Sequence, residues 1–259
     1  MCVKRCVVLV GIGISQSNPY NVGLNPKVHL NNYGRQSFFG VQGYGDSFQN
    51  NSPYLLFDEN IIRKMISENP EIKKILSEYK IPVVVNMKEL EELKTQHCKD
   101  TVDIAVNIAR NLPPALQQQI NIKNLKDGAL LHDFGKVMIP PEILNKPGEL
   151  TPAEHKIMDL HTELGYQLLK YTGINQDVLK LVRYHHDNDY PDINLQIISL
   201  ADKYSALTEK RVYKDKMTPK QALTTIYGDV KEGKVDQILF AALVKSLQKQ
   251  ESPQIVNKY

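Results

Sequence analysis

Residues 122–136 read IKNLKDGALLHDFGK and place a histidine beside an aspartate, His132-Asp133, at the end of an apolar helical stretch. A second doublet, His185-His186, ends another such stretch. Adjacent side chains that can carry charge are costly to bury unless something compensates them, and a metal ion compensates both members of a doublet. The two doublets therefore predict a buried metal site.

The doublets belong to an ordered series of imidazole and carboxylate side chains, which contains five of the seven histidines. In chain order the candidate ligands are His97, His132, Asp133, His161, His185, His186 and Asp202. Imidazole and carboxylate are ligands that hard and borderline metal ions take. A single buried histidine is more often a hydrogen-bonded core residue, so His97 and His161 gain weight only beside the doublets.

These donors exceed the four that one tetrahedral zinc takes, which favours two divalent ions. The series contains no cysteine, and this favours iron or manganese over structural zinc. Asp133, beside a histidine, suits a bridging position. Two adjacent cations would lower the pKa of a bridging water and clamp a phosphate ester, with Lys136 placed to offset charge on a phosphate oxygen. The alternative for Lys136 is a solvated surface lysine.

Helical periodicity with short links extends from Asp58 onward and predicts an all-α bundle. Capping residues and prolines mark the helix starts, and Gly135 is expected to stop the helix that carries the first doublet. The expected helices are 59–68, 70–79, 87–112, 122–134, one from Pro152, one from Asn175, 195–207, one from Pro219, and 235–247.

Three regions differ in composition. Residues 1–57 are rich in Asn, Gly, Ser, Gln and Tyr, which predicts an irregular, poorly ordered segment with one short strand at 7–10. Residues 58–86 form a small helical lead-in. Residues 87–250 form the metal-binding domain.

The net charge of +3 gives no electrostatic case for binding a nucleic-acid polymer or an acidic membrane. No apolar run approaches the roughly 18 residues of a membrane span. Three cysteines, Cys2, Cys6 and Cys98, fit neither a disulfide framework nor a zinc knuckle. We therefore expect a cytoplasmic protein.

The stretch HDFGKVMIPPEILNKPGELTPAEHKIMDLHTELGYQLL (132–169) resembles the HD superfamily of metal-dependent phosphohydrolases. Together with VRYHHDNDYPDINLQIISLADKYSALTEKRVYKDKMTPKQAL (182–223), it is similar to the HD-GYP family of cyclic di-GMP phosphodiesterases. The similarity covers about residues 90–248. It implies a helical bundle with iron or manganese, the seven ligands named above, and opening of cyclic di-GMP to pGpG or GMP. It also implies phosphate contacts from Lys136, Arg211 and Lys214.

The chain departs from the family pattern at three places. After His185-His186 the family has Glu and an Asp-Gly-x-Gly-Tyr-Pro segment; here residues 187–191 are shorter, keep Tyr190 and Pro191, and lack both glycines. Leu93 stands where members with three metal ions have a glutamate, so we expect two ions. Ser205 replaces an aspartate.

Three functions follow from these observations. The first is a phosphodiesterase acting on a cyclic dinucleotide. The second is an HD-type hydrolase of another nucleotide or phosphomonoester, which the shortened loop motivates. The third is a non-catalytic signalling module with a regulatory partner bound through residues 1–86.

Overall fold

The computed structural model describes residues 57–94, 96–187, 192–209 and 216–251. These residues lie within one compact unit, Ser37–Tyr259. Every regular element among them is a helix, so the predicted all-α class is confirmed. Residues 1–56, with the strand expected at 7–10, fall outside the described part. No helix in that part is both long and apolar enough to cross a membrane.

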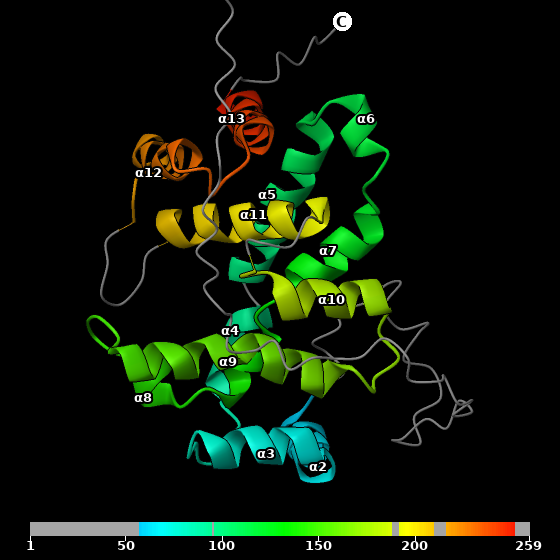
Figure 1. The fold of residues 1–259 in the computed structure, drawn as a ribbon, viewed down its shortest axis with the longest axis vertical. Helices are drawn as coiled ribbons and strands as arrows, with labels where there is room; N and C mark the ends of the chain where they lie inside the picture. Colours follow the sequence, from blue (N-terminus) through cyan, green and yellow to red (C-terminus); the bar gives the residue numbers. More distant parts are fainter. Residues whose placement is uncertain (1–56, 95, 188–191, 210–215, 252–259) are drawn as a thin grey trace, which may run out of the picture. The chain divides into compact units, whose positions relative to one another are not determined.

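The helices follow one another with short connections (Figure 1). They are α2 (Glu59–Glu68), α3 (Pro70–Glu78), α4 (Met87–Lys94), α5 (Gln96–Asn111), α6 (Pro114–Gln117), α7 (Ile122–Leu131), the 3₁₀ helix η2 (Phe134–Met138), α8 (Pro141–Leu144), α9 (Pro152–Leu169), α10 (Gln176–Tyr184), α11 (Ile193–Thr208), α12 (Pro219–Lys231) and α13 (Gln237–Glu251).

The predicted helix starts are confirmed by side-chain caps. Asp58, Asn69 and Asn175 accept hydrogen bonds from the first-turn amides of α2, α3 and α10. Asn86 accepts from the amide of Glu89 at the start of α4. Thr151 forms a reciprocal capping box in α9. Local sequence signals decided these boundaries because each cap is made within one turn.

The helix that carries the first doublet ends earlier than expected. It stops at Leu131 instead of Phe134, and residues 134–138 form η2. Gly135 lies inside η2 and is not a helix stop, which corrects the prediction. A methyl group on Gly135 would overlap the carbonyl oxygen of His161 and approach the amide nitrogen of Gly165 at 2.5 Å. Glycine is required here because the backbones of η2 and α9 touch.

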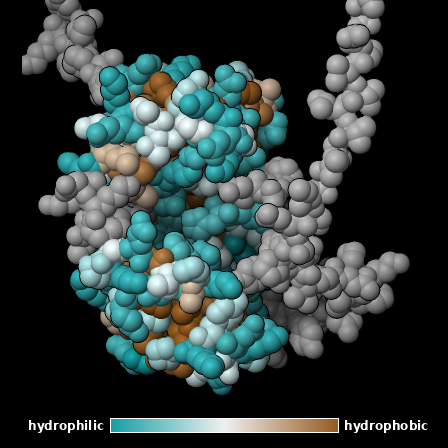
Figure 2. Space-filling model, turned by 60° about the vertical axis from the view of Figure 1, so that its left-hand side comes forward, coloured by the Kyte–Doolittle hydropathy of each residue, from teal (hydrophilic) through white to brown (hydrophobic). Residues whose placement is uncertain are grey.

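Buried apolar side chains form two clusters. The first joins α2, α3, η2 and α9, and the second joins α5, α7, α11, α12 and α13. Helix α10 contributes to both, with Val178 and Val182 in the first cluster and Leu181 in the second. Helix α7 does the same through Leu131 and Ala129. The C-terminal ends of α7 and α10, where the two doublets stand, therefore lie between the clusters. Figure 2 shows a hollow with a hydrophilic lining on one face of the molecule.

The contact between η2 and α9 generates a stability prediction. Gly135→Ala should lower the free energy of unfolding by at least about 2 kcal/mol, because backbone atoms cannot rotate away from the new methyl group. Urea denaturation with a chelator present measures this. Gly228→Ala in α12 is the matched control, since no atom lies within 4 Å of its added methyl group. Alanine there should be neutral or stabilising. Equal stabilities for both variants would refute the close-contact argument.

Candidate metal centre

The first doublet stands where α7 turns into η2. His132 keeps helical backbone angles as the last residue of the α7 turn, and Asp133 has φ −92° and ψ 3°. This bridge conformation, which is sparsely populated, lies where the chain turns from α7 into η2. Both side chains are buried. Their burial places a carboxylate and an imidazole in the interior, as the sequence indicated.

Three buried histidines share one orientation. The Nδ1 atoms of His132, His161 and His185 lie 2.8, 2.6 and 2.8 Å from backbone carbonyl oxygens three residues earlier in the chain. Carbonyls only accept, so each Nδ1 carries a proton, and Nε2 presents a lone pair whenever the ring is neutral. Such a bond on the outer nitrogen orients an imidazole for metal binding through the other nitrogen.

The lone pairs converge from α9 and the end of α10. The Nε2 atoms of His161 and His185 are 3.2 Å apart. The ring centroid of His186 lies 5.2 Å from that of His161 and 4.1 Å from that of His185. One nitrogen from each of these three histidines lies within 4.8 Å of the others.

Asp133 stands between this trio and His132. Its Oδ1 lies 3.4 Å from His161 Nε2, and its Oδ2 lies 3.2 Å from His132 Nε2. His132, Asp133 and His185 form a second group whose donor atoms also lie within 4.8 Å of one another. Asp202 on α11 reaches the same region, with Oδ1 3.6 Å from His132 Nε2. The two groups share His185, and Asp133 turns one oxygen toward each.

The donor set fits a cation. Two Nε2 lone pairs facing each other at 3.2 Å repel, and no proton is available between them when both Nδ1 atoms are protonated. Two ligands about 2.1 Å from one ion and at right angles to each other would be about 3 Å apart. The 3.2 Å spacing of His161 and His185 is therefore compatible with a shared ion.

The pKa values divide the candidate histidines into three that are lowered and one, His132, that is raised. Burial lowers the pKa of His161 to about 3, with a further contribution from the Lys136 ammonium. Burial and the neighbouring imidazoles lower the pKa of His185 well below its usual range, and partial desolvation lowers that of His186, which keeps a solvent-exposed side. For His132, burial alone would lower the pKa, but the Asp133 carboxylate and Asp202 outweigh it and raise the pKa to about 9. Three imidazoles are thus neutral near pH 7, as metal ligands must be.

Lys136 lies beside the candidate donors, and its side chain is mostly buried. Its Nζ lies 2.6 Å from Asp133 Oδ2, and 19% of its side chain is exposed. Asp202 is exposed to a similar degree, and His186 is exposed. The buried donors therefore have a side that a ligand can approach, and the ammonium group of Lys136 lies on that side.

The remaining predicted residues divide between described and undescribed parts. His97 lies in α5, but its side chain is outside the description. Arg211, Lys214 and residues 188–191 of the shortened loop also lie outside it. Leu93 is buried in the first hydrophobic cluster and Ser205 is buried on α11. His155, expected to be a non-ligand, is exposed on α9.

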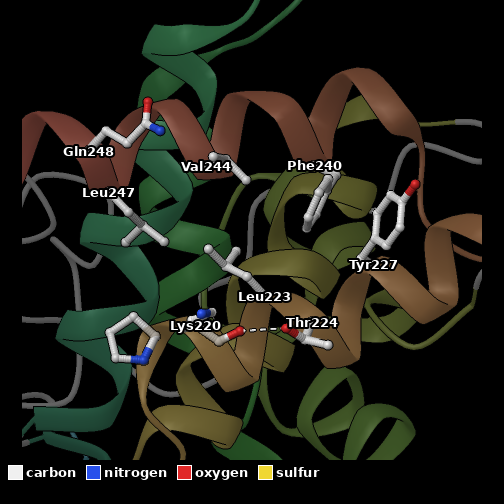
Figure 3. Close-up of a pocket in the computed structure, with 9 residues that line it drawn as sticks. Lys220, Leu223, Thr224, Tyr227, Phe240, Val244, Leu247 and Gln248 are labelled. Atoms are coloured by element: carbon white, nitrogen blue, oxygen red, sulfur yellow. Dashed lines mark hydrogen bonds between the residues drawn. The ribbon is translucent and has the colours of Figure 1, made fainter.

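A groove between α12 and α13 contains none of the candidate donors (Figure 3). Its volume is about 440 Å³, and its apolar lining comes from Leu223, Tyr227, Phe240, Val244 and Leu247. The sequence reasoning did not find this groove. The apolar residues that line it recur at helical spacing on both helices, and the same sequence pattern is produced by a helix face that packs in the core.

Comparison with known proteins gives a consistent result. Residues 95–207 match the family model of the HD domain. The chain is 34% identical over 120 residues to the cyclic di-GMP phosphodiesterase response regulator RpfG of Xanthomonas campestris pv. campestris, covering 41% of this chain and 32% of the relative. It is 29% identical over 166 residues to the 3'3'-cGAMP-specific phosphodiesterase 1 of Vibrio cholerae, covering 59% of this chain and 38% of the relative.

A cyclic di-GMP phosphodiesterase of Thermotoga maritima is 32% identical over 124 residues, covering 42% of this chain and 33% of the relative. The chain thus spans about a third of the length of these curated relatives. The matched region contains six of the donors whose geometry is given above, together with His97. Residues 95–207 of this chain belong to the HD domain family.

Proposed function

We propose that this protein is a metal-dependent phosphodiesterase that hydrolyses a cyclic dinucleotide, with cyclic di-GMP as the first candidate substrate. The observation that carries the proposal is the pair of donor groups joined by His185, with Asp133 turned toward both. The relatives described above are named for hydrolysis of cyclic di-GMP or 3'3'-cGAMP. Products would be pGpG or GMP.

The proposed cofactor is a pair of divalent ions, iron or manganese. Their ligands would be His97, His132, Asp133, His161, His185, His186 and Asp202. Such ions, when bound, supply a water of lowered pKa and electrostatic stabilisation of a phosphate ester. The absence of thiolate among the described donors supports iron or manganese over structural zinc.

The chain's own residues orient the metal ligands and offset the charge of the phosphate. The carbonyls that accept from Nδ1 fix the ring orientation of His132, His161 and His185 and hold the neutral His161 and His185 in one tautomer. Lys136 sits beside the donors with part of its side chain exposed, where its ammonium can meet a non-bridging phosphate oxygen. Arg211 and Lys214 remain our proposal for further phosphate contacts.

A second candidate is hydrolysis of another nucleotide or a phosphomonoester. It is favoured by residues 187–191, which read Asp-Asn-Asp-Tyr-Pro and lack the glycines that allow close approach of a ligand. A third is a signalling module without catalysis. Regulation through residues 1–86 remains a proposal as well, supported by the packing of α2 and α3 against α9, the helix that carries His161.

Asp133 provides the direct test of the metal centre. Asp133→Ala should reduce bound metal and lower kcat/KM on cyclic di-GMP by at least about 100-fold, because it removes the carboxylate that faces both donor groups. Metal analysis and product chromatography measure the two effects. Asp127→Ala is the control, since Asp127 on α7 pairs with Lys123 and no candidate donor. Turnover of monoesters alone would favour the second candidate, and a folded protein that cannot take up metal would favour the third.

Lys136 separates phosphate stabilisation from metal binding. Lys136→Gln should lower kcat/KM about 10²–10³-fold, the usual cost of losing one preorganised charge partner in the transition state. Metal content should stay close to wild type, because Lys136 donates no ligand atom. Unchanged turnover in this variant would exclude a substrate contact from Lys136.

The histidine pKa values predict how the metal-free protein responds to acid. In the unfolded chain histidine titrates near 6.5, so His161, His185 and His186, whose pKa values are lowered by folding, contribute stability that is present above pH 6.5 and lost as the pH falls. His132, raised to about 9, has the opposite sign, and its contribution is lost between pH 6.5 and 9.

Lowering the pH from 7.0 to 5.5 in the presence of a chelator should therefore reduce the free energy of unfolding. His161, whose pKa falls to about 3, contributes a loss of about 1 kcal/mol over this interval, and urea denaturation measures it together with the losses at His185 and His186. His161→Gln should lose about that much less than wild type. His155→Gln, exposed on the same helix, should behave like wild type. A pH-independent stability over this range would contradict the assignment of neutral buried imidazoles.

A further inference from the structure

An ion pair ties α9 to α10 close to the histidines. Arg183 Nε lies 2.7 Å from Glu163 Oε2, and both side chains are mostly buried. Glu163 stands two residues after His161, and Arg183 stands two residues before His185. The pair therefore joins the two helices at the level where their donor histidines emerge.

The carboxylate of Glu163 is held on both oxygens. Gln167, one turn further along α9, donates from Nε2 to Glu163 Oε1 at 2.7 Å. The backbone carbonyl of Gln167 accepts in turn from Nδ2 of Asn69, the N-cap of α3, at 2.9 Å. Gln167 Nε2 and Arg183 Nε each donate to one oxygen of the Glu163 carboxylate. A neutral amide at position 163 has only one oxygen, so it can accept from only one of these two donors.

The guanidinium of Arg183 is also fixed by its aromatic neighbours. It lies 4.4 Å from the ring centroid of Tyr166 on α9 and 5.5 Å from that of Tyr184. Stacking on an aromatic face while donating to a carboxylate is a combination that the planar guanidinium provides and an ammonium does not. Arg183 thus links α10 to α9 through Glu163 and Tyr166, in addition to the apolar contacts between the two helices.

We propose that Glu163 and Arg183 are positioning residues that hold His185 and His186 opposite His161. The inference rests on the proposed metal centre. His185 follows α10 directly as its C-cap, so the end of α10 sets where its Nε2 lies. The 3.2 Å approach of the two Nε2 atoms leaves little tolerance for movement of one helix against the other.

The proposal predicts a selective effect. His132 and Asp133 come from the α7–η2 junction, which the ion pair does not contact through any described bond. Loosening α10 displaces two donors of the first group, His185 and His186, and only the shared His185 of the second. The first ion should therefore be weakened more than the second. A purely structural role would lower stability without separating the two binding steps.

The test uses the full chain, with Mn²⁺ titrated into protein stripped of metal and free Mn²⁺ followed by electron paramagnetic resonance. Glu163→Gln and Arg183→Lys should each weaken one binding step about 10- to 100-fold, the usual effect of disturbing groups that orient metal ligands, and weaken the other by a clearly smaller factor. Lys146→Gln is the matched control. Its ion pair with Glu154 also involves α9 and has similar exposure, 29% and 26% against 29% and 28%.

The outcomes distinguish the two proposals. If wild type binds no Mn²⁺, or any other divalent ion tried in its place, the proposed metal centre fails. If wild type binds two ions and both variants keep both affinities, the metal centre stands and the positioning role is overturned. An equal loss of both steps, or the same loss in Lys146→Gln, also overturns it. Urea denaturation with chelator checks that each variant is folded, and Arg183→Lys carries the test if Glu163→Gln does not fold.

Discussion

The bond from histidine Nδ1 to a carbonyl three residues earlier is the contact on which the candidate centre depends. His132, His161 and His185 all make it, each within its own helical turn. The contact needs no partner from another element, so each histidine is oriented by its own helical turn. Packing of the helices then has one remaining task, which is to bring the prepared Nε2 atoms and the Asp133 carboxylate together.

That packing carries an electrostatic cost. Neutral imidazoles and one carboxylate are removed from water between two hydrophobic clusters, and two Nε2 lone pairs face each other at 3.2 Å. Burial of a charged or polar group without compensation is unfavourable. In the metal-free state, the ammonium of Lys136 and the raised pKa of His132 compensate Asp133, and the His161–His185 contact has no such relief from these two groups. The clusters on either side provide the stability that tolerates this strain, which is a common arrangement at functional sites.

Local sequence signals predicted the elements well where the signal and the structure it specifies lie within one turn. Asp58, Asn69, Asn86, Thr151 and Asn175 cap helices because each cap is a contact between near neighbours. Gly135 was misassigned because its reason is a backbone contact with α9, more than twenty residues away, which no local pattern encodes. The early end of α7 has the same origin, since η2 must turn to meet α9.

The candidate ligands could be selected from the sequence because doublets at the ends of apolar helices are chemically conspicuous. Their partners were not selected, because a glutamate, a glutamine and an arginine on amphipathic helices look like ordinary surface residues. Glu163 becomes visible only when α9 and α10 are placed side by side and both of its oxygens are seen to be occupied. Residues that bind an ion must be of a few chemical types, whereas residues that place those ligands can be of almost any type. Sequence reasoning therefore finds the reacting groups of such a centre, and only the packed structure shows what holds them at the distance that the chemistry requires.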